Sequence, residues 1–213
     1  MRDSRRLAAW AGMVGPILFV AVFTIEGFLR PGYNPLTTYI SDLSIGDRGI
    51  VQIVNFIVFG FLFFAFSYGV TLEFRERNLS LTGPRIFTGM AVLLILSGPL
   101  VTQPAGTPLS EMTWMGILHN ILGACFFVLG PVSCYVFWRS IQTDSKWKQI
   151  RGITLVAGIL LTIILIVFSV AQKSEMLMPN ALTSWAGVIQ RLDLITFFIW
   201  MVIFAWELKK DIT

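Results

Sequence analysis

Residues 50–72 read IVQIVNFIVFGFLFFAFSYGVTL and contain no charged side chain. A helix needs about 20 predominantly apolar residues to cross the hydrocarbon core of a bilayer. Because lipid offers the backbone no hydrogen-bond partner, a single segment of this kind crosses it as a helix. The segment therefore predicts a transmembrane helix. Similar runs predict six spans in all, at approximately residues 7–28, 50–72, 85–102, 115–138, 152–171 and 187–206.

Composition favours a membrane protein over a soluble one. Hydrophobic residues make up 55% of the chain and charged residues 13%, with a mean hydropathy of +0.76, whereas soluble domains carry about 25% charged residues. The net charge of +4 does not indicate nucleic-acid binding, because the charges flank the apolar runs. We expect a single domain, residues 1–213, that is all-α: a polytopic six-transmembrane-helix bundle surrounded by membrane lipids.

The distribution of positive charge predicts the orientation of this bundle. Most of the 16 Lys and Arg residues fall in the two termini and in the connections near residues 73–85 and 139–151. Because Lys and Arg are enriched in cytoplasmic loops, both termini are predicted to be cytoplasmic. The long connection at residues 30–49 then faces the other side, and a loop of this length is often a lid or binding element.

A threefold pattern runs through the predicted helices. A polar residue follows a glycine by 14 positions in the odd-numbered spans and by three positions in the even-numbered ones. The pairs are Gly12 and Glu26, Gly89 and Gln103, Gly158 and Gln172, Gly49 and Gln52, Gly116 and His119, and Gly187 and Gln190. The spacing predicts three pseudo-repeated helical hairpins. Coincidence is the alternative, since glycine is frequent in membrane helices.

Ten polar or charged residues lie near the predicted extracytoplasmic ends of the spans. An ionisable group inside a bilayer costs roughly 2.5–3.5 kcal/mol on insertion scales and usually faces a protein interior or a water-filled cavity. We therefore predict that these side chains line a polar pocket capped by residues 30–49. They are Glu26, Arg30, Asp42, Gln52, Asn55, Gln103, His119, Gln190, Arg191 and Asp193.

Some of these residues also have plain structural interpretations. Glu26 and Arg30 are four residues apart, and such a pair can meet on one face of a helix. Arg191 lies near the predicted membrane boundary, where its long side chain can extend to water.

His119 is the one histidine of the chain, and three roles are open to it. It can form a buried hydrogen bond to Glu26, Asp193 or a backbone carbonyl, or it can bind a polar or anionic ligand. It can also act as a general acid or base, for which an imidazole is suited. A single histidine cannot supply the usual zinc ligand sets, so we predict no metal and no cofactor.

Four short motifs point to a known family. They are Gly27-Phe-Leu-Arg-Pro-Gly-Tyr-Asn-Pro35, Ile40-Ser-Asp-Leu43, Asn55-Phe-Ile and Gly116-Ile-Leu-His119. In these motifs the chain resembles the domain-of-unknown-function 998 family of prokaryotic membrane proteins, over about residues 8 to 206. The resemblance implies six helices and a place in the plasma membrane. It implies no established activity, so no catalytic residue is carried over from it.

Several functions stay open from the sequence. The leading hypothesis is an integral membrane protein that binds a lipid or other amphiphile in the extracytoplasmic pocket. The alternative is a membrane-embedded enzyme acting on a lipid headgroup, with His119 as acid or base and Glu26 as the carboxylate that orients it. A small transporter with a helix broken at Gly98 and Pro99, or a structural subunit, would be further alternatives. Whether the chain has a protein partner or forms a homo-oligomer is also open.

Overall fold

The computed structural model describes residues 2–104, 107–177 and 183–210, which form six α-helices and short 3₁₀ helices without a strand. The helices are α1 (Arg2–Leu29), α2 (Gly49–Glu76), α3 (Thr82–Ser97), α4 (Trp114–Ser140), α5 (Arg151–Leu177) and α6 (Ala186–Lys210). The predicted all-helical fold is confirmed.

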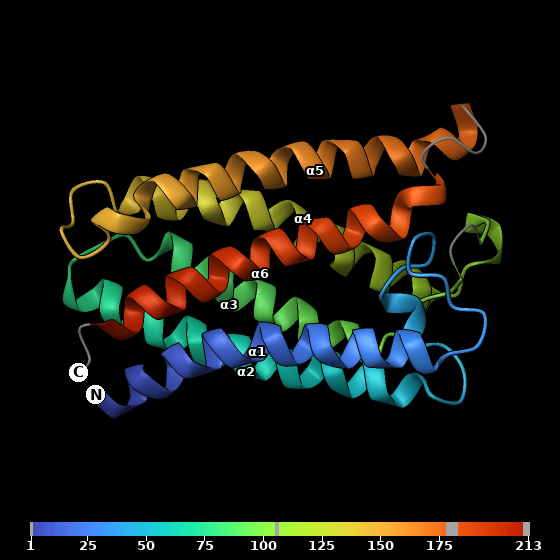
Figure 1. Ribbon diagram of the computed structural model, residues 1–213, viewed down its shortest axis with the longest axis horizontal. Coiled ribbons are helices and arrows are strands. Elements are labelled where there is room, and N and C mark those ends of the chain that lie inside the picture. Colours follow the sequence, from blue (N-terminus) through green and yellow to red (C-terminus); the bar gives the residue numbers. More distant parts are fainter. Residues whose placement is uncertain (1, 105–106, 178–182, 211–213) are drawn as a thin grey trace.

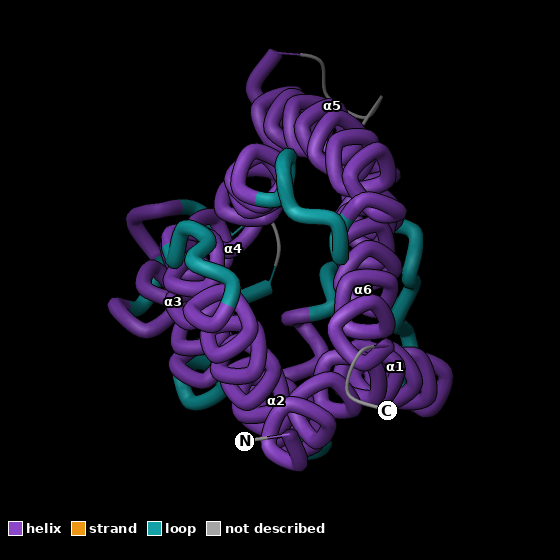
Figure 2. The backbone as a smooth tube through the Cα atoms, turned by 90° about the vertical axis from the view of Figure 1, so that its left-hand side faces the viewer, coloured by secondary structure: helices purple, strands orange, loops and turns teal. Residues whose placement is uncertain are grey.

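The six helices form a closed ring. Each helix packs against the next one in the chain, and α6 packs against α1 to complete the circuit. Figure 1 shows the helices running along the long axis of the molecule, and Figure 2 shows the ring from one end. Both termini lie at the same end (Figure 1), which we call the terminal end, and the opposite end is called the distal end.

Helix α3 is shorter than its neighbours. The other five helices are long and apolar enough to cross a membrane, but the 16 residues of α3 span only about 24 Å. The helix ends at Ser97, so the predicted end of the third span near residue 102 was wrong. The physical reason is Pro99, which has no backbone N–H to donate to the next helical hydrogen bond.

Large aromatic side chains fill the middle of the ring toward the terminal end. Within this group the ring centroids of Phe87 and Phe137, and those of Trp147 and Phe204, are 4.6 Å apart. Close-packed rings bury large apolar areas and leave few voids. We call this group the aromatic plug. Its members are almost completely buried: Phe74, Phe87, Phe137, Trp147, Trp200 and Phe204.

A buried ionic cluster closes the terminal end beyond the aromatic plug. The Glu73 carboxylate accepts hydrogen bonds from Arg5 at 2.7 Å and from Arg77 at 2.6 Å, and the ammonium of Lys146 lies 3.5 Å away. The Glu73 side chain is only 4% exposed. Because these partners come from α1, α2 and the connection after α4, the cluster joins segments that are distant in sequence.

The threefold repeat stays a prediction. A Cβ atom on Gly49, Gly116 or Gly187 would lie within 2.7 Å of an oxygen atom, so these three even-helix glycines share a close approach by an acceptor. The odd-numbered helices share no such feature, since Gly12 faces the Phe66 ring while the space beside Gly89 is open. The side chain of Gln172 lies outside the described residues.

Candidate binding cavity at the distal end

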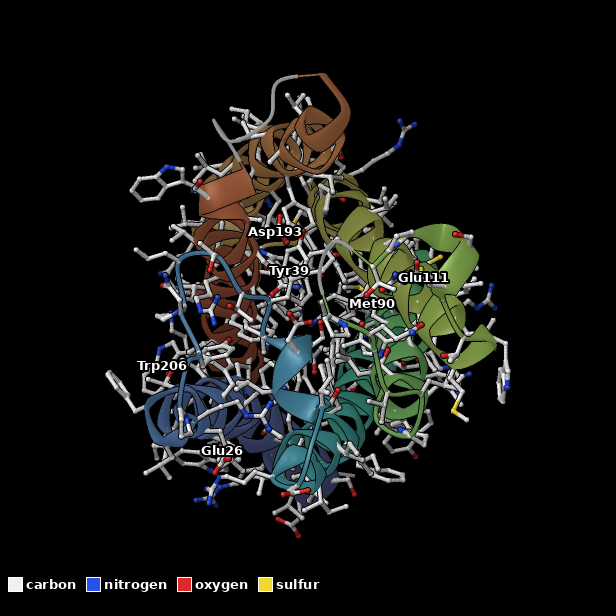
Figure 3. All side chains as sticks on the ribbon, turned by 90° about the vertical axis from the view of Figure 1, so that its right-hand side faces the viewer. Glu26, Tyr39, Met90, Glu111, Asp193 and Trp206 are labelled. Carbon is white, nitrogen blue, oxygen red and sulfur yellow. The ribbon has the colours of Figure 1, made fainter. Side chains whose placement is uncertain are left out.

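The distal half of the ring encloses a cavity of about 640 Å³. All six helices contribute to its wall. Residues 37 and 39–41 of the first distal connection, which joins α1 to α2, and residues 102–104, 107–108 and 112 of the second, which joins α3 to α4, also line it. Figure 3 looks into this end, with Tyr39 over the middle of the ring. The volume falls within the range of about 300–1,000 Å³ that is usual for small-molecule sites.

The deep part of the cavity is apolar. Phe19 and Phe198 pack at 5.8 Å between ring centroids, and Phe126 packs against Phe197 at 5.8 Å. Phe197 in turn contacts Phe87 of the aromatic plug. The floor is therefore a continuation of the aromatic core. Its members are Phe19, Phe56, Leu94, Phe126, Leu194 and Phe198.

Two residues of α6 fasten the first distal connection over the cavity. The guanidinium of Arg191 donates to the backbone oxygens of Pro35 at 2.8 Å and Thr38 at 3.0 Å. Gln190 accepts from the backbone N–H of Ile40 at 2.8 Å. The sequence allowed the interpretation that the Arg191 side chain simply extends to water. The structure shows instead that it binds the backbone of the first distal connection. It holds the lid in place.

Tyr33 extends this fastening. Arg191 donates a hydrogen bond to the Tyr33 phenol oxygen, and the phenol donates to the backbone oxygen of Tyr39 at 3.1 Å. Burial raises the pKa of Tyr33, and the neighbouring Arg191 offsets this only in part. The phenol therefore keeps its proton at neutral pH, as the hydrogen bond to Tyr39 requires.

His119 lines the cavity with one ring nitrogen already engaged. Its Nδ1 lies 2.6 Å from the backbone oxygen of Leu100 and 3.2 Å from that of Ser97. Carbonyl oxygens only accept hydrogen bonds, so Nδ1 carries the proton. The ring thus caps the end of α3, and Nε2 has no hydrogen-bond partner among the residues that the structure describes. In the neutral ring, Nε2 is an acceptor.

Gln103 also lies in the wall and organises the second distal connection. Its Oε1 accepts from the backbone N–H of Thr113 at 2.6 Å, and its amide donates to the backbone oxygen of Glu111 at 3.3 Å. A Cβ on Gly116 would lie 2.7 Å from that Oε1. Glycine at this position therefore lets the loop approach the start of α4.

Glu26, Arg30 and Asp42 are not among the residues that line the cavity. Glu26 pairs with Arg48 through two hydrogen bonds of 3.0 and 2.6 Å, so the expected pair with Arg30 was wrong. Arg30 donates to the backbone oxygen of Asp42 at 2.9 Å. Figure 3 shows Glu26 on the α1 side of the molecule, away from Tyr39. These interactions fix the conformation of the first distal connection, but the three side chains do not belong to the cavity wall.

Gln52, Asn55 and Asp193 are buried but lie behind the wall. The Asn55 amide donates to the Phe19 backbone oxygen at 3.1 Å and to Gln52 at 3.2 Å, so this pair joins α2 to α1. Asp193 is 4% exposed, and its Oδ1 has no hydrogen-bond partner within the described part of the chain. Of the ten predicted residues, the cavity wall therefore contains Gln103, His119 and Gln190.

Apart from Gln103, His119 and Gln190, sequence reasoning missed the residues of the second distal connection and of α4, α5 and α6 that complete the wall. On α6 the lining residues Ala186, Gln190, Leu194 and Phe198 recur every four positions. That spacing places side chains on one helical face. The signal was present, but it mixes polar and apolar residues and a search for polar ones alone does not find it.

No charged side chain belongs to the wall as far as the described residues define it. The polar groups that remain are hydroxyls, carboxamides and the imidazole, and they gather near the mouth. They are Thr37, Tyr39, Ser41, Ser97, Thr102, Gln103, Thr107, His119, Asn120, Ser169 and Gln190. Such groups match an uncharged polar ligand group, while the phenylalanine floor matches an apolar one.

A ring of helices, five of which are long and apolar enough to cross a membrane, identifies a polytopic integral membrane protein. Residues 13–207 match the family described as protein of unknown function (DUF998). The chain belongs to that family, which confirms the resemblance carried by the short motifs. Comparisons with curated proteins and with solved structures gave no match.

Proposed function

We propose that this protein binds one uncharged amphiphile in the distal cavity. The observation that carries the proposal is the arrangement of the cavity itself: an apolar floor of aromatic rings below a mouth with neutral hydrogen-bonding groups. An amphiphile has the same division between an apolar chain and a polar head. The polar head would meet His119, Gln190 and Gln103, and the chain would lie against Phe19, Phe126 and Phe198.

The absence of charge among the described wall residues supports an uncharged head. A phosphate would need a cation, and Arg191 is one of the two arginines that were predicted to line the pocket. Its guanidinium instead binds two backbone oxygens of the lid, and it also donates to the Gly187 carbonyl at 2.8 Å. Releasing Arg191 to a ligand would cost those charge-assisted hydrogen bonds.

The proposal includes a place for the protein in the membrane. All six helices would cross the plasma membrane, with the non-helical residues after Ser97 completing the passage that α3 begins. Both termini would be cytoplasmic, because most Lys and Arg residues lie at the terminal end. The cavity would then face the extracytoplasmic side.

The enzyme alternative has one observation in its favour. The bonds from Nδ1 to Ser97 and Leu100 fix the His119 ring and leave Nε2 as a possible base. However, the carboxylate expected to orient this ring, Glu26, is engaged by Arg48. Turnover of a lipid by the wild-type protein, lost in His119→Gln, would favour catalysis over binding.

His119→Asn provides a direct test of binding. The shorter amide is expected to retain a donor near the position of Nδ1 and to remove Nε2, so α3 remains capped while the ligand loses one hydrogen bond. One such bond is worth about 0.5–1.5 kcal/mol, which corresponds to a two- to tenfold weaker affinity at roughly 1.4 kcal/mol per tenfold. Titration of the purified protein with a monoacylglycerol, followed by native mass spectrometry, measures this change.

Two further measurements complete this test. His119→Phe should lower the melting temperature as well, because it removes both nitrogens. The proposal would be overturned if the wild-type protein bound neither monoacylglycerol nor diacylglycerol and co-purified with no amphiphile in mild detergent.

A further inference from the structure

Part of the cavity wall is exposed rather than enclosed. Asn120, Ala124 and Val128 on α4, and Ser169 on α5, line the cavity although their side chains are exposed. Val128 is 48% exposed. Exposed side chains in a cavity wall indicate that the cavity is open beside them. These four residues all flank the seam between α4 and α5.

The seam is closed toward the terminal end. There, a Cβ on Gly158 would lie 3.1 Å from the Cβ of Cys134, and the hydroxyls of Tyr135 and Thr162 are 3.0 Å apart. Figures 1 and 3 show α4 and α5 separating toward the distal end. A Cβ on Gly123, which lines the cavity, would meet no atom within 4 Å. The distal part of the seam therefore leaves open space beside α4.

One aromatic contact crosses the seam at intermediate depth. The rings of Phe127 and Phe168 have centroids 5.7 Å apart, and both residues line the cavity. Exchange between staggered rotamers moves such a ring without moving the backbone. This pair can therefore admit a flexible hydrocarbon chain.

Polarity along the seam follows depth in the membrane. His119 and Asn120 lie in the second turn of α4, close to its distal end at Trp114. Val128 lies near the middle of the 27-residue helix, about 21 Å from Trp114 at 1.5 Å per residue. The opening thus runs from a polar region near the membrane boundary to an apolar one near the middle. A lipid in that leaflet has the same order of head and chain.

From these observations we infer that an uncharged lipid enters the cavity sideways from the distal leaflet, through a portal between α4 and α5. Its head would lie at His119 and Asn120, and its chain would pass Phe127 and Phe168. This inference rests on the proposed function, since it specifies the ligand as a membrane lipid and gives its route. The portal is defined by Asn120, Gly123, Ala124, Val128, Leu165 and Ser169.

Photo-crosslinking tests the route. The full chain is reconstituted in phosphatidylcholine vesicles that contain diacylglycerol with a diazirine at the end of one acyl chain, and labelled residues are identified by mass spectrometry. Labels on portal residues, above those on other lipid-facing positions such as Ile199, are expected. Labels confined to the enclosed floor and the distal connections would overturn lateral entry while leaving amphiphile binding intact. No label in the cavity or portal would overturn both.

Gly123→Phe provides an independent test. The Cβ of a phenylalanine here would meet no neighbour within 4 Å, and its ring would occupy the open space in the portal. At least tenfold less diacylglycerol label in the cavity is expected. Gly89→Phe is the matched control, because Gly89 is also helical, has open space beside it and lies outside the cavity wall. Equal labelling of the two variants, with melting temperatures like that of the wild type, would overturn the portal. If Gly123→Phe fails to fold, Ala124→Trp, at an exposed portal residue, replaces it in the same comparison.

Discussion

Replacement of Glu73 by glutamine is expected to lower the free energy of unfolding by about 3–5 kcal/mol, the usual effect of breaking a buried ion pair. Glu73 is the acidic centre of the cluster at the terminal end, where Arg5, Arg77 and Lys146 converge on its carboxylate. Without the negative charge, Lys146 loses an anion 3.5 Å away, while Arg5 and Arg77 each lose one carboxylate partner and retain Glu76 and Asp144 respectively. The Lys146 side chain is only 3% exposed, so water can stabilise its positive charge only weakly.

Glu76→Gln is the matched control for this prediction. Glu76 pairs with the same Arg5 at 2.6 Å, but its side chain is 63% exposed. Exposed pairs contribute about 0–1 kcal/mol, so this variant should unfold like the wild type. Unfolding of both proteins in mixed detergent, followed by tryptophan fluorescence, measures the difference. Trp147 lies in the aromatic plug beside the cluster. Equal stabilities of the two variants would show that the cluster does not hold the terminal end together.

Arg191→Leu is expected to release the first distal connection from α6. The substitution removes the donors to Pro35, Thr38 and Tyr33, and hydrogen bonds to a charged group are worth about 1.5–3 kcal/mol each in net terms. Amide hydrogen exchange of residues 33–40 should become at least tenfold faster. Affinity for a monoacylglycerol should fall as well, because residues 37 and 39–41 form part of the cavity wall.

Two comparisons make this prediction specific. Arg191→Lys keeps the charge but lacks the planar fork that reaches several acceptors, so it should restore exchange protection only in part. Arg85→Leu removes an exposed arginine at the start of α3, far from the lid in the chain, and should change neither exchange nor affinity. Unchanged exchange of residues 33–40 in Arg191→Leu would show that Gln190 and Tyr33 hold the lid without it.

Apolar length predicted the helices and their order well, because a membrane helix depends on a local property of the chain. The apolar run at residues 50–72 predicted α2 without information about the helices that pack against it. The end of α3 was missed although its cause, Pro99, is visible in the chain, because the apolar run continues past the break. The family was likewise predicted from short sequence motifs, which can be recognised without the tertiary structure.

The site was predicted less completely. The placement of polar residues at one end and of a lid over them was anticipated, but the partners of Glu26 and Arg191 were not. Glu26 has two arginines within reach along the chain, Arg30 and Arg48, and only the path of the first distal connection brings Arg48 to it. The wall of α4 and α5 was missed because its residues are mostly apolar and look like ordinary lipid-facing positions.

The sequence by itself determined that the chain is a helical membrane protein, and it predicted polar groups near one end of the helices. Those features follow from the length and polarity of single segments, because the free energy of placing a segment in the bilayer depends mainly on its own residues. Only the tertiary structure decided which polar groups line a shared cavity and which fasten loops. In a closed ring of six helices, each helix packs against two neighbours. These contacts set the rotation of the helix about its axis and so decide which side chains face the cavity.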